Sequence, residues 1–226
     1  MKEKLIAAHR GFHKNFPENS IAAFNAAISA KADIIELDVR KTKDNMLVVS
    51  HNPDFNGKII SRTNSVDLPE LARLESVLDL AKGKVVLDIE LKESGYEEKA
   101  VSLALKHLQP KDFVFTSFKK LSMVKIKRHF PEIKVGWLFS PNFLARIIDW
   151  FWLHSPYLKY TDFLAPHYSL EKNFSGKNNL WFWTIDGEEN LIKFIAHSGA
   201  EVIITNEPDV ALQLKIENYD TGHEQK

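Results

Sequence analysis

The segment Asp33-Ile-Ile-Glu-Leu-Asp-Val39 has the alternation of a β-strand, and Val85-Val-Leu-Asp-Ile-Glu-Leu-Lys92 repeats its pattern of two acidic residues around one apolar residue. Side chains two positions apart on a strand point to the same face, so each acidic pair is directed one way. The pairs are Glu36 with Asp38 and Asp88 with Glu90. Acidic residues are disfavoured in strands and costly to bury alone, which favours a shared divalent cation as their partner. The alternative is an exposed sheet face, on which alternating charge is ordinary.

Short apolar segments alternate with segments of helical periodicity along almost the whole chain. The predicted strands are Leu5–Ala8, Ile34–Lys41, Met46–Ser50, Val85–Leu91, Phe113–Thr116, Val135–Phe139, Phe163–Ala165, Leu180–Ile185 and Glu201–Thr205. The predicted helices are Ser20–Lys31, Leu68–Lys82, Tyr96–Leu108, Lys120–Phe130, Phe143–Leu153, Glu188–His197 and Pro208–Asn218. Roughly eight βα units favour a parallel sheet closed into an α/β (β/α)8 TIM barrel. A doubly wound open sheet competes, but no glycine-rich turn follows the first strand.

The chain is predicted to form a single domain. Its 226 residues suffice for one core of barrel size, and no linker, low-complexity tract or repeat beyond the βα alternation interrupts them. We expect the barrel to span residues 1–218 and residues 219–226 to form a polar tail.

The composition of the chain excludes several classes of protein. It carries 30 basic and 30 acidic residues, which disfavours an electrostatic binder of nucleic acid. It contains no Cys, so it forms neither disulfides nor a thiolate zinc site. The N-terminal segment is too short in apolar residues for a signal peptide, and no stretch is long enough to span a membrane. These features predict a soluble, cytoplasmic protein.

Chemically reactive side chains recur where the predicted strands end. In a (β/α)8 barrel the active site lies at the C-terminal ends of the strands. The residues found there are His9, Arg10, Glu36, Asp38, His51, Glu90, Lys92, Trp183 and Asp186. They come from separated parts of the chain, and we expect them to converge at one mouth of the barrel.

This set of side chains suits a phosphate ester as substrate. A metal bound by Glu36, Asp38 and Glu90 would neutralise phosphoryl charge and bind or activate a hydroxyl group. Arg10 would grip two phosphate oxygens, and Lys92 would act as a second positive charge. The structural alternatives are a salt bridge from Arg10 to Glu36 or Asp38, and simple charge balance between Lys92 and Glu90.

Two His residues, His9 and His51, are candidates for acid–base chemistry. An imidazole titrates near neutral pH, so the two rings can serve as general base and general acid. A lone His at a strand end is more often structural, and it is the co-occurrence of both with the carboxylates that favours catalysis. The other His residues are expected to be solvated or structural, although His13 and His167 also lie near predicted strand ends.

Short motifs, in the same order along nearly the whole chain, resemble those of the glycerophosphodiester phosphodiesterase family. The strand around Glu36 and Asp38 is similar to its metal-binding ExD strand, and Ile89-Glu90-Leu-Lys92 is similar to its IEIK strand. The family signature HRG…PENT…AF is similar to His9-Arg10-Gly11, Pro17-Glu18-Asn19-Ser20 and Ala23-Phe24. The family hairpin TKDG…LVVxHD is similar to Thr42-Lys-Asp44 and Leu47-Val-Val-Ser-His51. The later blocks SF, WTVN and GVDGIITDxP are similar to Ser117-Phe118, Trp183-Thr-Ile-Asp186 and Gly199-Ala-Glu-Val-Ile-Ile-Thr-Asn206-Glu-Pro208, respectively.

The resemblance implies a TIM barrel that binds Ca²⁺ or Mg²⁺ and hydrolyses glycerophosphodiesters to sn-glycerol 3-phosphate and an alcohol. A substrate hydroxyl next to the phosphate would attack first and give a cyclic phosphate, with one His taking its proton and the other protonating the leaving alcohol. Which His does which stays open. By position, the implied metal ligands are Glu36, Asp38 and Glu90, the implied acid–base pair is His9 and His51, and the candidate substrate contacts are Arg10, Glu18, Lys92 and Trp183, with Glu18 near the metal or the glycerol unit.

Three residues depart from the family pattern. Asn52 stands where the family usually has Asp after the second His; it can accept a hydrogen bond but lacks the charge that would raise the pKa of His51. Asp186 replaces the usual Asn, which is a mild change. Asn45 replaces Gly in the hairpin turn, where Asn tolerates left-handed backbone.

The segment from Asn52 to Leu68 is shorter than the insertion that covers the substrate in many members of the family. We therefore expect a minimal cap after the second strand and an open cleft. Aromatic residues gather around the fifth strand of the barrel and its helix: Trp137, Phe139, Phe143, Trp150, Phe151 and Trp152. Core packing is the simpler explanation for them, and a lip in peripheral contact with lipid is the alternative.

Three functions compete on the sequence alone. The first is metal-dependent hydrolysis of a small-molecule glycerophosphodiester. The second is lysophospholipase D-type or sphingomyelinase D-like hydrolysis, which uses the same chemistry on a lipid. The third is a catalytically inactive phosphate-binding barrel. The intact His and carboxylate residues disfavour this function, and Asn52 is the one residue that favours it. The oligomeric state stays open.

Overall fold

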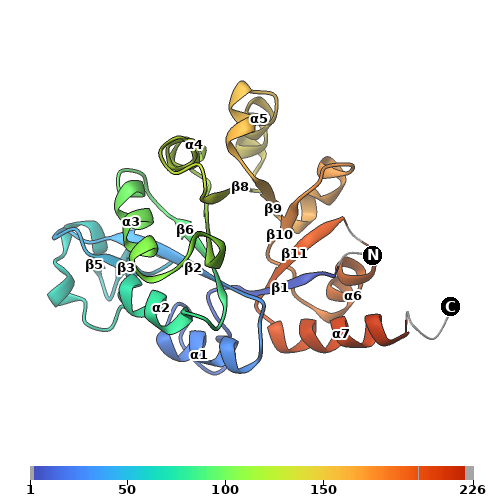
Figure 1. Cartoon of the computed structure of the whole chain (residues 1–226), viewed down its shortest axis with the longest axis horizontal. Coiled ribbons are helices and arrows are strands. Elements are labelled where there is room, and N and C mark those ends of the chain that lie inside the picture. The colour runs from blue at the N-terminus through green and yellow to red at the C-terminus, as the bar shows by residue number, and fades with distance from the viewer. Residues whose placement is uncertain (1–2, 198, 222–226) are drawn as a thin grey trace.

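Eight parallel strands form a closed ring in the computed structural model, which describes residues 3–197 and 199–221 (Figure 1). The strands of the ring are β1 (Leu5–Ala8), β2 (Ile34–Lys41), β6 (Val86–Leu91), β7 (Phe113–Ser117), β8 (Lys134–Phe139), β9 (Phe163–Pro166), β10 (Leu180–Phe182) and β11 (Ala200–Thr205). The ring closes because β1 pairs in parallel with both β11 and β2. The predicted TIM barrel is confirmed.

Helices lie outside the ring (Figure 1), and all but the last of them lie between strands along the chain. They are α1 (Ile21–Ser29), α2 (Leu74–Ala81), α3 (Glu97–His107), α4 (Lys120–His129), α5 (Phe143–Leu153), α6 (Glu188–His197) and α7 (Pro208–Thr221). Short 3-10 segments occur at Pro110–Asp112, Pro156–Tyr160 and Tyr168–Phe174, and the last of these is the connection from β9 to β10. Of the tail predicted from residue 219, residues 219–221 continue α7, and residues 222–226 lie outside the described residues.

A small insertion follows β3 (Leu47–Val49), which pairs antiparallel with β2. It contains the hairpin β4 (Asp54–Phe55) and β5 (Lys58–Ile59) and the 3-10 turns Ile60–Arg62 and Ser65–Asp67. The helix predicted from Leu68 begins only at Leu74, so that part of the prediction is wrong. The reason is a backbone contact: Val49 N–H donates to the carbonyl of Ala72 (2.8 Å), which holds this segment extended alongside β3.

The turn between β2 and β3 anchors this insertion through Asp44. Its carboxylate accepts hydrogen bonds from the Thr42 hydroxyl (2.6 Å) and from the Ser65 N–H and hydroxyl (2.8 Å each). These bonds lower the pKa of Asp44 to about 2. Asn45 next to it has a φ of 64°, which confirms the predicted left-handed turn residue.

Replacing Asp44 with Asn is expected to destabilise the protein at neutral pH but not in acid. Because the folded-state pKa of Asp44 is depressed below its usual 3.8, the stabilisation is complete well above 3.8 and is lost as the pH falls towards 2. Urea unfolding of both proteins between pH 7 and pH 3 checks this. A difference in unfolding free energy that does not shrink below about pH 4 would contradict it.

Two apolar layers hold the barrel together. One fills the inside of the ring and includes Phe163 and Trp181, whose rings stack with centroids 4.0 Å apart. The other lies between the strands and the outer helices, where Trp137 packs edge-on against Trp152. Core packing is therefore confirmed for the aromatic residues of β8, whereas part of α5 is exposed, as described below.

Gly136 is required by the inner layer. It pairs with Phe163 across β8 and β9, and a Cβ atom at position 136 would lie 2.1 Å from Cε2 of that ring. Gly136→Ala is therefore expected to lower the free energy of unfolding by about 2 kcal/mol, the usual range for overpacking a core. Chemical denaturation measures the loss. Gly199→Ala is the matched control, because a Cβ added there meets no atom of the described part of the chain within 4 Å. Equal stability of the two variants would contradict the prediction.

Candidate active site

The pairing of β2 with β6 brings the acidic residues together. Glu36 lies opposite Asp88 and Asp38 opposite Glu90 in the register of the two strands. All four residues are buried, and one carboxylate oxygen from each of Glu36, Asp38 and Glu90 lies within 4.8 Å of the others. The shared face predicted from the alternation is therefore present at the C-terminal end of the barrel strands.

The three carboxylates fit a hard divalent cation. They offer only oxygen ligands, which is the donor set that Ca²⁺ and Mg²⁺ prefer. Burial and the neighbouring carboxylates raise the pKa of Glu36 well above its usual value, and burial raises the pKa of Glu90 to about 7. A bound cation would offset the repulsion that these two shifts record.

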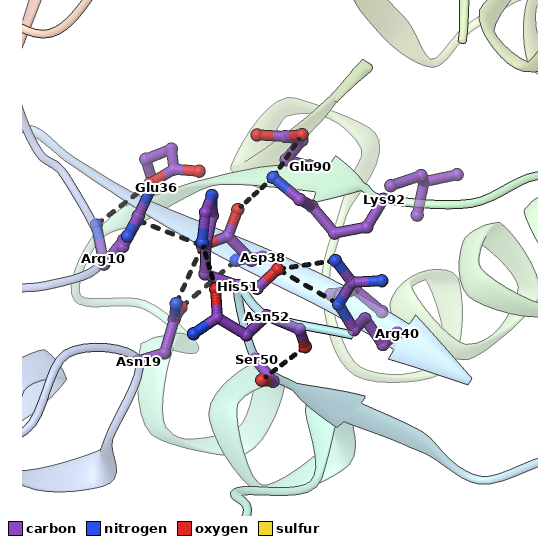
Figure 2. A network of polar contacts seen from close by, with 12 residues as sticks. Arg10, Asn19, Glu36, Asp38, Arg40, Ser50, His51, Asn52, Glu90 and Lys92 are labelled. Carbon is purple, nitrogen blue, oxygen red and sulfur yellow. Dashed lines mark hydrogen bonds and ion pairs between the residues drawn. The ribbon is translucent and has the colours of Figure 1, made fainter. Parts of the chain in front are cut away.

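Two basic side chains surround Asp38. Lys92 Nζ lies 3.1 Å from Asp38 Oδ1 and 2.9 Å from Glu90 Oε1, so the ammonium group stands between the two carboxylates (Figure 2). Arg10 Nε lies 3.2 Å from Asp38 Oδ2 on the other side. Although burial works in the opposite direction, Lys92 and Arg10 hold the pKa of Asp38 below its usual value. The ion pairs named as structural alternatives for Lys92 with Glu90 and for Arg10 with Asp38 thus both form.

Glu18 lies outside this cluster and contacts Arg10. Both of its carboxylate oxygens accept from Arg10 Nη1, at 3.0 and 2.9 Å, and 42% of its side chain is exposed. The Arg10 backbone is left-handed, with φ of 55°, and its N–H donates to Glu36 Oε2 (3.0 Å). Glu18 therefore orients the guanidinium group from the solvent side.

His9 and His51 approach the carboxylates from two different strands. His9 follows β1, exposes 16% of its side chain, and places Nε2 3.9 Å from Glu36 Oε2. Burial, with a further contribution from Arg10, lowers the pKa of His9 to about 4. His51 follows β3, and burial and Lys92 lower its pKa. Its Nδ1 lies 3.0 Å from Asn52 Oδ1, as expected for an Asn that accepts a hydrogen bond.

A cavity of about 200 Å³ lies at the barrel mouth, and side chains of this cluster line it. Trp183 forms part of its wall, with its indole N–H donating to the Ala165 carbonyl (2.7 Å) and its ring packed edge-on against Phe118. The predicted site residues that line the cavity are His9, Arg10, Glu36, His51, Glu90, Lys92 and Trp183. Asp38 is buried behind them, and Glu18 is not among the lining residues.

Comparison with known proteins indicates the family of this chain. Residues 9–96 match the model of the glycerophosphoryl diester phosphodiesterase family, and this range includes every predicted site residue except Trp183 and Asp186. A glycerophosphodiester phosphodiesterase from Caldanaerobacter subterraneus subsp. tengcongensis is 29% identical over 93% of this chain and 97% of its own. The chain belongs to the glycerophosphodiester phosphodiesterase family. The predicted family and the predicted class of enzyme, a phosphoric diester hydrolase, are confirmed.

Solved structures of other proteins share the fold of this chain. A glycerophosphodiester phosphodiesterase from Parabacteroides distasonis has a TM-score of 0.81 and 23% identity, covering 96% of this chain and 98% of its own. An Oleispira antarctica phosphodiesterase, solved in complex with the product sn-glycerol-3-phosphate, has a TM-score of 0.76 and 20% identity, covering 95% and 97%. Among the described residues, no helix combines the length and apolar character needed to cross a membrane.

This glycerophosphodiester phosphodiesterase barrel also contains site residues that were not singled out from sequence. Arg40, on β2, donates from Nε (3.1 Å) and Nη2 (2.6 Å) to the carbonyl of His51 (Figure 2). It also forms an ion pair with Glu93. Asn19 donates to Asp38 Oδ2 (2.8 Å) and accepts from the Asp38 N–H (3.2 Å). Strand alternation places Arg40 on the face of Asp38, and this signal could have identified it.

Asp88 is the fourth carboxylate of the two strands and forms part of the cavity wall. Burial raises its pKa to about 7, although the Thr116 hydroxyl donates to its Oδ1 (2.7 Å). Its Oδ2 is buried and has no hydrogen-bond partner within residues 3–197 and 199–221. Asp88 thus belongs to the site but lies outside the group of three that could hold a cation.

Proposed function

We propose that the protein hydrolyses glycerophosphodiesters to sn-glycerol 3-phosphate and an alcohol with a divalent cation, Ca²⁺ or Mg²⁺, held by Glu36, Asp38 and Glu90. The observation that carries this proposal is the buried oxygen triad, two members of which, Glu36 and Glu90, line the same small cavity as His9 and His51. The names of the relatives support it, since one is a glycerophosphodiester phosphodiesterase and another binds the proposed product.

Each side chain of the cavity has a role in this reaction. When bound, the cation would neutralise phosphoryl charge and favour ionisation of a hydroxyl group. Arg10 and Lys92 would contact the phosphate oxygens, and Trp183 would bound the glycerol side of the cavity. One His would take a proton from the attacking hydroxyl while the other gives a proton to the leaving alcohol.

The direct test is release of glycerol 3-phosphate from glycerophosphocholine by the purified protein. We expect release with Ca²⁺ or Mg²⁺, loss of release with EDTA, and recovery when the metal is restored. Full activity in EDTA would overturn the metal-dependent mechanism. No release from several glycerophosphodiesters, with the metal still bound, would make an inactive phosphate-binding barrel the better interpretation. The predicted cytoplasmic location stays a prediction that cell fractionation would test.

A second candidate, lysophospholipase D-type hydrolysis, is favoured by the exposed face of α5. The helix follows the C-terminal end of β8 (Figure 1). The cavity is lined by residues at this same end of the barrel strands. Six of its large apolar residues are 49–72% exposed: Phe143, Leu144, Ile147, Ile148, Trp150 and Phe151. An apolar helix beside the site would suit peripheral contact with a membrane that contains the substrate.

Two measurements separate this candidate from the first. Choline release from lysophosphatidylcholine, in the absence of release from glycerophosphocholine, would favour the lipid substrate. Co-sedimentation with phosphatidylcholine vesicles would test lipid contact. The variant combines Trp150→Ser with Phe151→Ser, and Val66→Ser, which changes an exposed apolar residue of the cap, is the matched control. Equal sedimentation of both variants and the parent would contradict a role of α5 in membrane contact.

A further inference from the structure

Asn206 and Asp186 form a hydrogen-bonded pair beside His9. Asp186 lies beyond β10, and Asn206 directly follows β11. The Asn206 side chain donates from Nδ2 to Asp186 Oδ2 (2.6 Å). The other carboxylate oxygen, Asp186 Oδ1, accepts from the Asn206 N–H (2.8 Å) and the Thr205 hydroxyl (3.1 Å). Both oxygens of Asp186 are therefore occupied by donors from one short segment of chain.

This arrangement fixes the orientation of the Asn206 amide. An ionised carboxylate can only accept hydrogen bonds, so the atom of Asn206 that faces Asp186 has to be the NH₂ group. The amide oxygen then points the other way, where His9 Nδ1 lies 2.7 Å and His13 Nε2 lies 3.0 Å from it. An amide that cannot rotate presents a fixed acceptor to both rings.

The fixed acceptor determines where the proton of His9 sits. Because the amide oxygen only accepts, the His9 nitrogen that faces it, Nδ1, carries the hydrogen. In the neutral ring the other nitrogen, Nε2, is then the acceptor, and it is directed towards the carboxylate cluster, 3.9 Å from Glu36 Oε2. His13 uses the second lone pair of the same oxygen and further restrains the amide.

We infer that Asn206 and Asp186 are positioning residues, which hold His9 as the tautomer with hydrogen on Nδ1 and keep Nε2 ready to take a proton from the attacking hydroxyl. When that proton arrives, the O–H bond breaks, a new N–H bond forms at Nε2, and the ring becomes a cation. Nδ1–H stays on the ring and keeps donating to Asn206, so no proton passes to the amide. The inference assigns the base role and rests on the proposed function.

In the described part of the chain, the ring of His51 is not held by a fixed amide in the way that the ring of His9 is. Its Nδ1 faces the side-chain oxygen of Asn52, but within the described residues that amide has no carboxylate contact to fix it. His51 is also anchored differently, through its backbone carbonyl and Arg40. The two His residues are therefore held in different ways, which favours different roles.

The test uses three variants of the pair in the full-length protein. Asp186→Asn lets the Asn206 amide rotate, Asn206→Ala removes the acceptor, and the double exchange Asp186→Asn with Asn206→Asp restores a pair in which a carboxylate faces His9. Long-range proton–nitrogen NMR at neutral pH, without substrate, shows which ring nitrogen of His9 carries hydrogen. Asn25→Ala, which removes an exposed amide on α1, is the matched control.

We expect hydrogen on His9 Nδ1 in the parent, the control and the double exchange, and a mixture of tautomers in the two single variants. With glycerophosphocholine, kcat should fall on the order of 10²-fold in the single variants with little change in KM, and recover in the double exchange. An unchanged tautomer in Asp186→Asn and Asn206→Ala would overturn the inference. The NMR result does not depend on turnover, so an inactive parent protein would overturn the proposed function and not the tautomer assignment.

Discussion

Replacement of His9 by Ala is expected to reduce kcat for glycerophosphodiester hydrolysis by about 10²–10⁴-fold, and His51→Ala should have an effect of similar size. Each imidazole transfers one proton in the proposed reaction, and both line the cavity beside the carboxylates. Neither ring belongs to the oxygen triad, so metal binding should be retained. Steady-state kinetics with glycerophosphocholine, together with calorimetric titration of Ca²⁺, measures both properties.

The matched control for these variants is His129→Ala, which removes an exposed His on α4, 54% of whose side chain is accessible. The double variant His9→Ala with His51→Ala should lose little more activity than either single variant, because the two proton transfers act as a unit. Both single variants should still bind glycerol 3-phosphate. Full turnover in His9→Ala would contradict the assigned acid–base pair.

The carboxylate cluster was predictable because strand alternation alone fixes which side chains share a face. Glu36 and Asp38 had to point together once β2 was recognised, and the register with β6 placed Glu90 opposite Asp38. The positions of the barrel strands followed from the same apolar pattern, although β10 ends at Phe182 and not, as predicted, at Ile185. These features depend on local sequence and on the closure of a parallel sheet, which leaves few alternatives.

Other features depend on contacts that local sequence does not reveal. The predicted start of α2 was wrong because the carbonyl of Ala72 accepts a hydrogen bond from the N–H of Val49, which lies 23 residues earlier in the chain. The contact of Glu18 with Arg10, eight positions before it, was not predicted, and a place for Glu18 near the metal or the glycerol stays a prediction. Asn206 lies far from His9 in sequence, and only closure of the ring between β11 and β1 brings them together.

The two proposed acidic ligands on β2, Glu36 and Asp38, are expected to differ in their effect on stability. Glu36 is buried among other carboxylates, and its pKa is raised first by burial and then by Asp38. In metal-free protein, Glu36→Gln should therefore increase the free energy of unfolding, by on the order of 1 kcal/mol. Asp38→Asn should decrease it by roughly 2 kcal/mol, because Lys92 and Arg10 lose a buried partner.

Both substitutions should nevertheless weaken metal binding. Each removes one proposed carboxylate ligand from the oxygen triad, so the increase in Tm that we expect Ca²⁺ to give the parent protein should disappear in both, with affinity lowered about 100-fold or more. Thermal unfolding with EDTA and with Ca²⁺ measures the two effects separately. A stability change of the same sign in the two variants would contradict the electrostatic difference between Glu36 and Asp38. A Ca²⁺-dependent rise in Tm that survives in Glu36→Gln would remove Glu36 from the metal site, because a ligand that sheds its charge without loss of binding does not hold the cation.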